Sequence, residues 1–216
     1  YPPSTTHPFG TDQDARDMLS RTVFGARVSL TVGLVAIAMG MFFGGLLGIL
    51  AGYLRGWWDR VVSFIFIIFL SFPALVLAIL ITALLVRRLW PIPTTLGILS
   101  IAPVGRVARA TTISFADREF VLAARTLGAK NGRIIVRELL PNVLIPMSAL
   151  ALLGMAVAVV AEGGLAFLGL SVEKGPTWGK VILTGAGSRD LQNSPWIALI
   201  PIAVLFLTVL SLNFAG

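Results

Sequence analysis

Cysteine is absent from this sequence, histidine occurs once, and charged residues make up only 12% of its 216 positions. The absence of cysteine excludes disulfide bonds and thiolate metal sites. The single histidine, His7, lies close to the first residue and is typical of a solvated loop. We also find no carboxylate pair, no Ser-His-Asp constellation and no cluster of metal ligands, so the sequence predicts neither a catalytic centre nor a metal site.

Long uncharged runs fill most of the chain. Residues 28–53, 61–86 and 191–216 carry no charge, and each run is longer than the roughly 20 residues that cross a bilayer. A run at 139–172 is interrupted only by Glu162, and a shorter, proline-containing run covers 89–105. We therefore predict an all-α, polytopic membrane protein, with spans at about 28–53, 61–86, 89–112, 141–170 and 194–216.

Glycine and proline are placed regularly within these runs. The first span carries Gly40, Gly44, Gly48 and Gly52 at intervals of four residues. This spacing aligns the glycines on one helix face and lets a neighbouring backbone approach closely, most simply within the same molecule. Prolines inside the predicted spans indicate kinks, because each removes a helix hydrogen bond; they are Pro73, Pro103, Pro146 and Pro201.

The net charge is +7, which in a membrane protein points to cytoplasmic loops and lipid headgroups. Basic residues concentrate between residues 106 and 137, which favours a cytoplasmic location for that loop. A nucleic-acid binder is disfavoured, because carboxylates offset these cations and aromatic residues are nearly absent there.

The stretch FVLAARTLGAKNGRIIVRELLPN, residues 120–142, is the most polar part between two spans. The pattern Ser114-x-x-Asp117 predicts a helix that begins there with a capping box. Gly128 is suited to the left-handed residue that ends this helix. A second short helix, about 131–140, is expected to stop at Pro141. The small Ala123 and Ala124 and the cations around them favour docking of a partner or, equally, contact with lipid phosphates.

Part of this stretch, AARTLGAKNGRIIVRELLP, resembles the Glu-Ala-Ala (EAA) motif of ATP-binding-cassette (ABC) importer permeases. Leu122 stands where that family commonly has glutamate, and Glu138 where it has isoleucine. Segments 7–33, 50–75 and 161–179 are similar to permeases of dipeptide and oligopeptide importers, whose relatives include nickel and glutathione importers. The residues in register with the motif are Ala123, Ala124, Gly128, Leu140 and Pro141.

This resemblance implies a five-helix type I ABC importer transmembrane core at 28–216, preceded by an extracytoplasmic entry segment at 1–27. It places the chain in a bacterial or archaeal cytoplasmic membrane, in a longer protein with one further span before residue 7. The implied partners are a second permease, two cytoplasmic ATPase subunits that bind ATP and Mg, an extracytoplasmic substrate-binding protein and lipid, but no nucleic acid.

The resemblance further implies that segment 114–141 couples ATP hydrolysis on the ATPase subunits to movement of peptides by alternating access. The chain itself would bind no cofactor and would not be an enzyme. The implied coupling residues are Ala123, Ala124, Arg125, Gly128, Ala129, Lys130, Arg133, Leu140 and Pro141.

Glu162 is the one acidic residue inside an otherwise apolar span. An unpaired charge there costs at least a few kcal/mol, so the carboxylate needs a partner. It either lines the translocation path or outer gate, or bonds a backbone or partner-subunit group. A self-contained channel or secondary transporter is the other class of function, but the internal repeats common in such folds are not visible.

Overall fold

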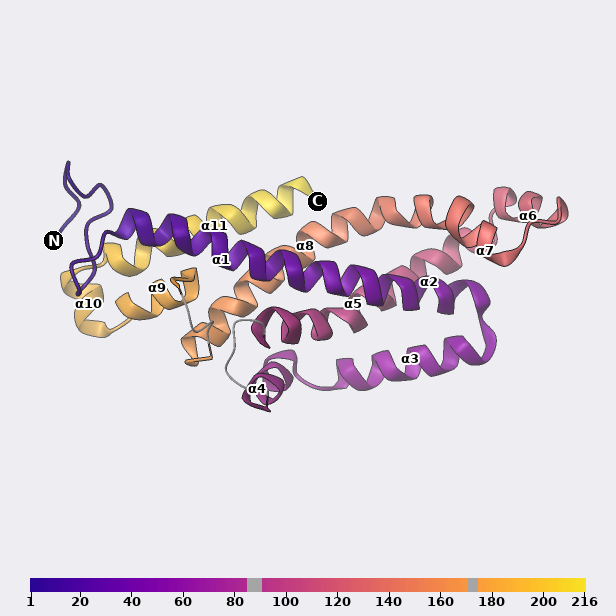
Figure 1. Ribbon diagram of the computed structural model, residues 1–216, viewed down its shortest axis with the longest axis horizontal. Helices are drawn as coiled ribbons and strands as arrows, with labels where there is room; N and C mark the ends of the chain where they lie inside the picture. Colours follow the sequence, from indigo (N-terminus) through magenta and orange to yellow (C-terminus); the bar gives the residue numbers. More distant parts are fainter. Residues whose placement is uncertain (85–90, 171–174) are drawn as a thin grey trace.

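The computed structural model describes residues 1–84, 91–170 and 175–216, and these residues form a long helical bundle (Figure 1). The predicted all-α fold is confirmed: the described residues contain no strand, only an isolated bridge between Thr11 and Asp17. The helices are α1 (Met18–Met39), α2 (Gly45–Leu54), α3 (Gly56–Ser71), α4 (Ala74–Leu84), α5 (Pro91–Ala116), α6 (Glu119–Thr126), α7 (Asn131–Arg133), α8 (Leu140–Phe167), α9 (Trp178–Gly185), α10 (Ser188–Asn193) and α11 (Trp196–Ala215). Two π-helical segments, η1 (Gly40–Gly44) and η2 (Ile134–Leu139), join α1 to α2 and α7 to α8.

Three continuous helices in the described residues are long and apolar enough to cross a membrane: Met18–Leu54, Asn131–Phe167 and Trp196–Ala215. The first two have 37 residues each and the third has 20, against the roughly 20 that a bilayer requires. They fall on the predicted spans at 28–53, 141–170 and 194–216.

The second predicted span, 61–86, is not one straight helix. α3 and α4 meet at an angle of 91°. The break lies at Phe72, whose backbone is extended, and at Pro73, which follows it. Proline has no N–H to donate and disfavours helical angles in the residue before it, which explains the break. Residues 85–86 of this span and 89–90 of the next lie outside the described residues, as does 171–174 within the predicted segment 161–179.

α5 lies at the centre of the bundle and packs against α1, α2, α3, α4 and α8. The glycines that recur every four residues face α5: a Cβ on Gly52 would lie 2.8 Å from the carbonyl oxygen of Arg109. A Cβ on Gly40 would lie 2.7 Å from the Cβ of Ser100. The two helix backbones therefore approach more closely than side chains would allow, and the interpretation of the repeat as an internal packing surface is confirmed.

The polar residues before α1 fold back on its beginning. The carboxylate of Asp17 accepts a hydrogen bond from the Ser20 backbone N–H at 2.8 Å and caps the helix. This bond, with a smaller contribution from His7 at 3.1 Å, lowers the pKa of Asp17. Asp12 forms an ion pair with Arg21 in the first turn of α1. α1 thus begins at residue 18, inside the predicted entry segment 1–27.

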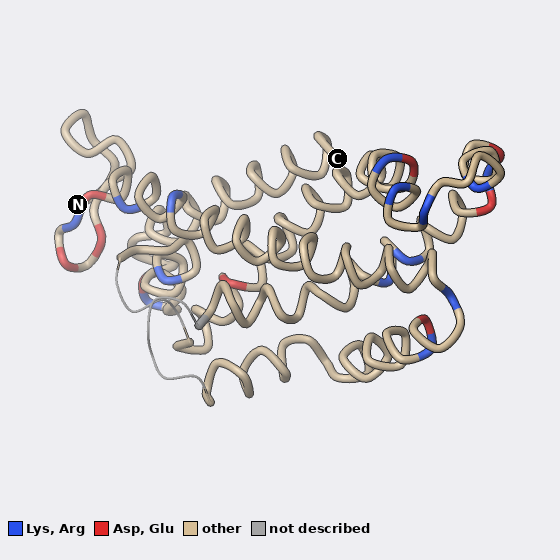
Figure 2. The backbone as a smooth tube through the Cα atoms, turned by 45° about the vertical axis from the view of Figure 1, so that its right-hand side comes forward, with Lys and Arg blue, Asp and Glu red and all other residues tan. Residues whose placement is uncertain are grey.

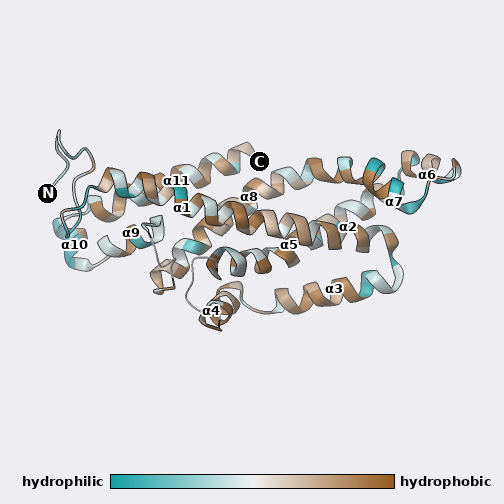
Figure 3. Cartoon of the chain, viewed as in Figure 1, coloured by the Kyte–Doolittle hydropathy of each residue, from teal (hydrophilic) through white to brown (hydrophobic). Residues whose placement is uncertain are grey.

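Charged residues gather toward the two ends of the bundle (Figure 2), and the helices between them are largely hydrophobic (Figure 3). Many large apolar side chains on the outside are exposed, including Phe64 at 63% on α3 and Phe206 at 61% on α11. An exposed apolar surface between two charged ends is the pattern expected of a protein embedded in a bilayer.

Candidate functional site

The loop between α5 and α8 forms a projection at one end of the molecule (Figure 1). Its first helix, α6, begins at Glu119, after Arg118. The predicted capping box is therefore wrong, because α5 continues to Ala116 and Ser114 is still within that helix. The Ser114 hydroxyl donates to the carbonyl of Thr111 at 2.7 Å instead of capping a new helix.

Gly128 ends α6 in the left-handed conformation, with φ of +78°. The N–H of Gly128 donates to the carbonyl of Arg125 at 2.9 Å, and the N–H of Ala129 donates to that of Ala124 at 3.0 Å. This pair of bonds is a Schellman motif. The prediction that Gly128 closes the helix is confirmed, and the glycine fixes the direction in which the chain leaves α6.

The helix after the turn does not stop at Pro141, contrary to the sequence-based prediction. α7, η2 and α8 form one continuous helix from Asn131 to Phe167. Proline opposes an α-helix through its missing N–H and its clash with the carbonyl four residues earlier. Just before Pro141, η2 has π-helical hydrogen bonds, in which each N–H bonds a carbonyl other than the one used in an α-helix. In addition, the Asn142 side chain donates to the Glu138 carbonyl at 2.7 Å. The projection is thus directly continuous with α8.

A small apolar core holds the projection together. Val121 from α6 and Ile134 and Leu139 from η2 are fully buried against Tyr53 of α2 and Ala116 of α5. Burying apolar area of this kind contributes about 25 cal/mol per Å². The projection is therefore a packed unit, not a loose basic loop.

Polar contacts attach this unit to the turn between α2 and α3. The Tyr53 hydroxyl donates to Oδ1 of Asn131 at 3.1 Å, and the guanidinium of Arg125 lies 5.2 Å from the centre of the Tyr53 ring. Arg55 forms an ion pair with Asp117 at 2.6 Å. The sequence pattern did not indicate these partners, although Arg55 and Asp117 carry opposite charges and two predicted spans lie between their loops, so both loops are expected on the same side of the membrane.

The predicted coupling residues all lie on this projection or where it joins α8. Ala124, Ala129 and Leu140 are half-buried. The exposed members are Ala123, Arg125, Gly128, Lys130, Arg133 and Pro141. Two further residues on its surface were not among the predicted set: Leu122 is 48% exposed and Leu127 is 87% exposed.

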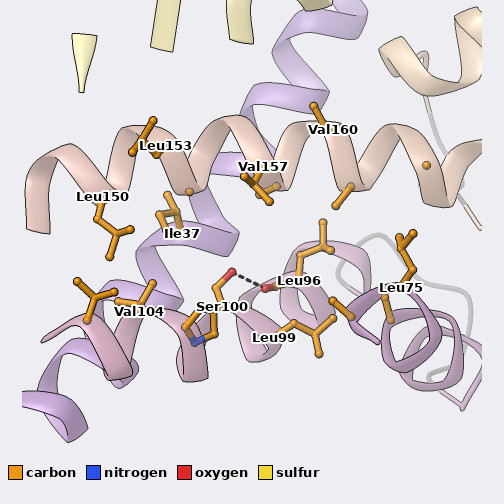
Figure 4. A pocket seen from close by; sticks show the side chains of 18 residues that line it. Ile37, Leu75, Leu96, Leu99, Ser100, Val104, Leu150, Leu153, Val157 and Val160 are labelled. Atoms are coloured by element: carbon orange, nitrogen blue, oxygen red, sulfur yellow. Dashed lines mark hydrogen bonds between the residues drawn. The ribbon is translucent and has the colours of Figure 1, made fainter. Parts of the chain in front are cut away.

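A cavity of about 640 Å³ lies between α1, α4, α5 and α8. Figure 4 shows its lining, in which Leu150, Leu153 and Val157 come from α8 and Leu96 and Leu99 from α5. Among the residues that the structure describes, the one polar side chain in the lining is Ser100, whose hydroxyl donates to the carbonyl of Leu96 at 2.7 Å. The described lining of the cavity is therefore an apolar surface without charged side chains.

Glu162 is buried in the last turns of α8 and does not line this cavity, although its neighbour Ala161 does. The Ser29 hydroxyl donates to its Oε2 at 3.0 Å and accepts a hydrogen bond from the Trp178 backbone N–H at 3.2 Å. Among the described residues Oε1 has no hydrogen-bond partner. The carboxylate thus joins α8 to α1 and, through Ser29, to the beginning of α9, so its partner is a side chain of the same chain and not the expected backbone or partner-subunit group.

Glu162→Gln is therefore expected to leave the range of transported substrates unchanged, because the amide oxygen can still accept the Ser29 hydrogen bond. Uptake rates and competition by a panel of substrates, measured in the assembled transporter, check this. Ser29→Ala is the companion variant, since it removes the same bond from the other side. A changed substrate range in Glu162→Gln alone would place this carboxylate in the translocation path.

The described residues hold no group of three or more His, Asp or Glu side chains that could bind a metal ion. Together, the helical bundle, its apolar outer surface and the helical projection define a polytopic membrane protein with a packed unit at one end. The same fold occurs in a chain of the inward-facing MetNI methionine ABC transporter, with a TM-score of 0.73, 20% identity, and coverage of 92% of this chain and 94% of that chain.

The sequence comparisons identify the family. Residues 44–216 match the family described as "Binding-protein-dependent transport system inner membrane component", and this chain belongs to it. The dipeptide transport system permease protein DppC of Alkalihalophilus pseudofirmus is 41% identical over 99% of this chain and 70% of that relative. The glutathione transport system permease protein GsiD of Pectobacterium atrosepticum is 31% identical over 99% of this chain and 71% of that relative. The expected permease class is thus confirmed.

Proposed function

We propose that this chain forms the membrane path through which an ATP-driven importer moves dipeptides or oligopeptides by alternating access. The 41% identity to a dipeptide permease over nearly the whole chain supports this substrate class. Glutathione, itself a tripeptide, is the second candidate because of the 31% identical glutathione permease. The lining given by the described residues carries no charge that would distinguish between these two cargoes.

The observation that carries the proposal is the packed projection at residues 117–139. In the proposed mechanism α6 and the Gly128 turn rest on an ATPase subunit, through the coupling residues named above. Closure of the ATPase pair on ATP moves the projection, and the continuous helix Asn131–Phe167 carries the movement into the bundle. α8, which belongs to that helix, lines the apolar cavity together with α4 and α5. Displacing α8 therefore changes the shape of the path.

The proposed assembly contains a second permease, two cytoplasmic ATPase subunits and an extracytoplasmic substrate-binding protein, in the cytoplasmic membrane of a bacterium or archaeon. Membership of the binding-protein-dependent family supports these partners. ATP and Mg would bind the ATPase subunits. In this assembly the present chain itself would bind no cofactor and would carry no catalytic residue.

Uptake by the reconstituted transporter tests this function. The full-length protein, its partner permease and the ATPase subunits are placed in proteoliposomes with the binding protein, and uptake of labelled dipeptide, oligopeptide, glutathione and nickel is measured. We expect ATP-dependent uptake of dipeptide or oligopeptide. Uptake that proceeds without ATPase subunits would indicate a self-contained channel or secondary transporter, and uptake of nickel alone would overturn the peptide assignment.

A further inference from the structure

Leu122 occupies the centre of the exposed face of α6. Val121 and Ala124 lie on the buried face of the same helix and pack in the core of the projection. With a helical period of 3.6 residues, Leu122 then faces outward, and it is 48% exposed. Leu127, the residue that follows α6, is 87% exposed. Two exposed leucines on this short projection, one on α6 and one on the turn that follows it, indicate a surface that another molecule covers.

This face lies away from the bilayer. Exposed tryptophans are typical of the membrane interface, and Trp57 and Trp58 at the beginning of α3 are 64% and 57% exposed. Figure 1 shows that α6 projects past the beginning of α3 along the long axis of the molecule. The apolar side of α6 is already buried within the projection. What remains outside, two leucines, is too small an apolar area to hold a helix in lipid.

Cations border the leucines. Arg118 precedes Leu122 by four residues and Arg125 follows it by three, so both lie near it on the helix surface. Residues 118–138 carry five cations (Arg118, Arg125, Lys130, Arg133 and Arg137) against the two carboxylates Glu119 and Glu138. Within the part of the chain that the structure describes, none of these five cations forms an ion pair. A complementary surface therefore has an apolar centre and an acidic border.

We propose that Leu122 and Leu127 insert into an apolar seat on the cognate ATPase subunit, bordered by carboxylates that face Arg118 and its neighbours. This inference rests on the proposed function and adds the chemistry by which the chain selects its ATPase. Because leucine replaces the glutamate common at this motif position, the chain pairs with an ATPase whose groove is apolar there. An apolar anchor in a pocket with a charged rim is the usual arrangement of a tight protein interface.

The test measures the affinity of the ATPase subunits for the full-length permease pair in lipid nanodiscs. Leu122→Glu is expected to weaken binding at least about tenfold, since it places a carboxylate in the apolar seat. Leu122→Met keeps an apolar side chain and is expected to bind within about threefold of the original. Leu191→Glu is the matched control, because Leu191 is 45% exposed on α10 at the opposite end of the molecule. It is expected to leave the ATPase affinity unchanged.

Equal or tighter binding by Leu122→Glu would overturn the apolar seat, even if ATP-dependent uptake by the unchanged protein upheld the proposed function. A membrane anchor is the competing explanation. It would be shown by unchanged ATPase affinity of Leu122→Glu together with quenching, by brominated lipid, of a fluorescent probe attached at position 122. Failure of all uptake in the unchanged transporter would instead contradict the proposed function and not the chemistry of this surface.

Discussion

Gly128→Val is expected to abolish transport-coupled ATP hydrolysis while the membrane helices stay folded. Gly128 has a φ of +78°, where a β-branched side chain is strongly strained. A left-handed residue other than glycine costs roughly 1–2 kcal/mol, and the turn can relieve this cost by changing the direction between α6 and α7. Substrate-stimulated ATP hydrolysis in proteoliposomes is expected to fall at least about tenfold, and circular dichroism should show unchanged helix content.

Gly132→Val is the matched control for this variant. A Cβ on either glycine meets no atom within 4 Å, but only Gly128 has a positive φ. Valine at position 132 therefore adds the same side chain to an exposed helical turn without backbone strain, and near-normal coupling is expected. If Gly128→Val hydrolyses ATP and imports substrate normally, the geometry of this turn has no part in coupling.

The sequence predicted the features of the projection that depend on local chemistry. Gly128 could be assigned because a helix end with a left-handed residue strongly favours glycine. The helix start at Ser114 could not, because a capping pattern near the end of a helix does not show that the previous helix has finished. α5 continues to Ala116, and Ser114 bonds back within it. Local patterns therefore located the turn correctly but misplaced the start of α6.

Proline had opposite outcomes at two positions. Pro73 breaks the second predicted span, and α4 turns by 91° to pack against α5 and α8. Pro141 does not break its helix, because the π-helical turn before it rearranges the hydrogen bonds that an α-helix would need. Proline therefore breaks one span sharply and lies within a continuous helix in another. Packing and hydrogen-bond register decide between these outcomes, and a single sequence reports neither.

Contacts between residues far apart in the sequence were the least predictable part of the projection and of the surroundings of Glu162. Ser29 and Glu162 are 133 positions apart, and Tyr53 and Asn131 are 78 apart. The membrane environment predicted that Glu162 needs a partner, but not which helix supplies it. In contrast, the glycine repeat predicted its own packing role, because a stripe of small residues in a span is useful only where another backbone lies against it.

Gly48→Ala is the second change with a large expected effect, and it acts on stability. A Cβ at Gly48 would lie 2.9 Å from the backbone nitrogen of Arg109 and 2.9 Å from the Cβ of Ala108. Backbone atoms of α5 cannot move aside as a flexible side chain would, so α2 must separate from α5. Overpacking of this kind typically costs about 1–3 kcal/mol. We expect a lower melting temperature for the full-length protein in mild detergent, measured by thermal unfolding.

Gly45→Ala separates this overpacking from the general effect of alanine on a helix. Gly45 lies three residues away on the same helix, and a Cβ there meets nothing within 4 Å. Alanine is favoured over glycine within a helix by about 1 kcal/mol, so Gly45→Ala is expected to match or raise the melting temperature. Because both variants gain the same propensity, the difference between them isolates the close approach of α2 to α5. Equal melting temperatures would mean that these backbones are not in tight contact, and the central position of α5 would then require another explanation.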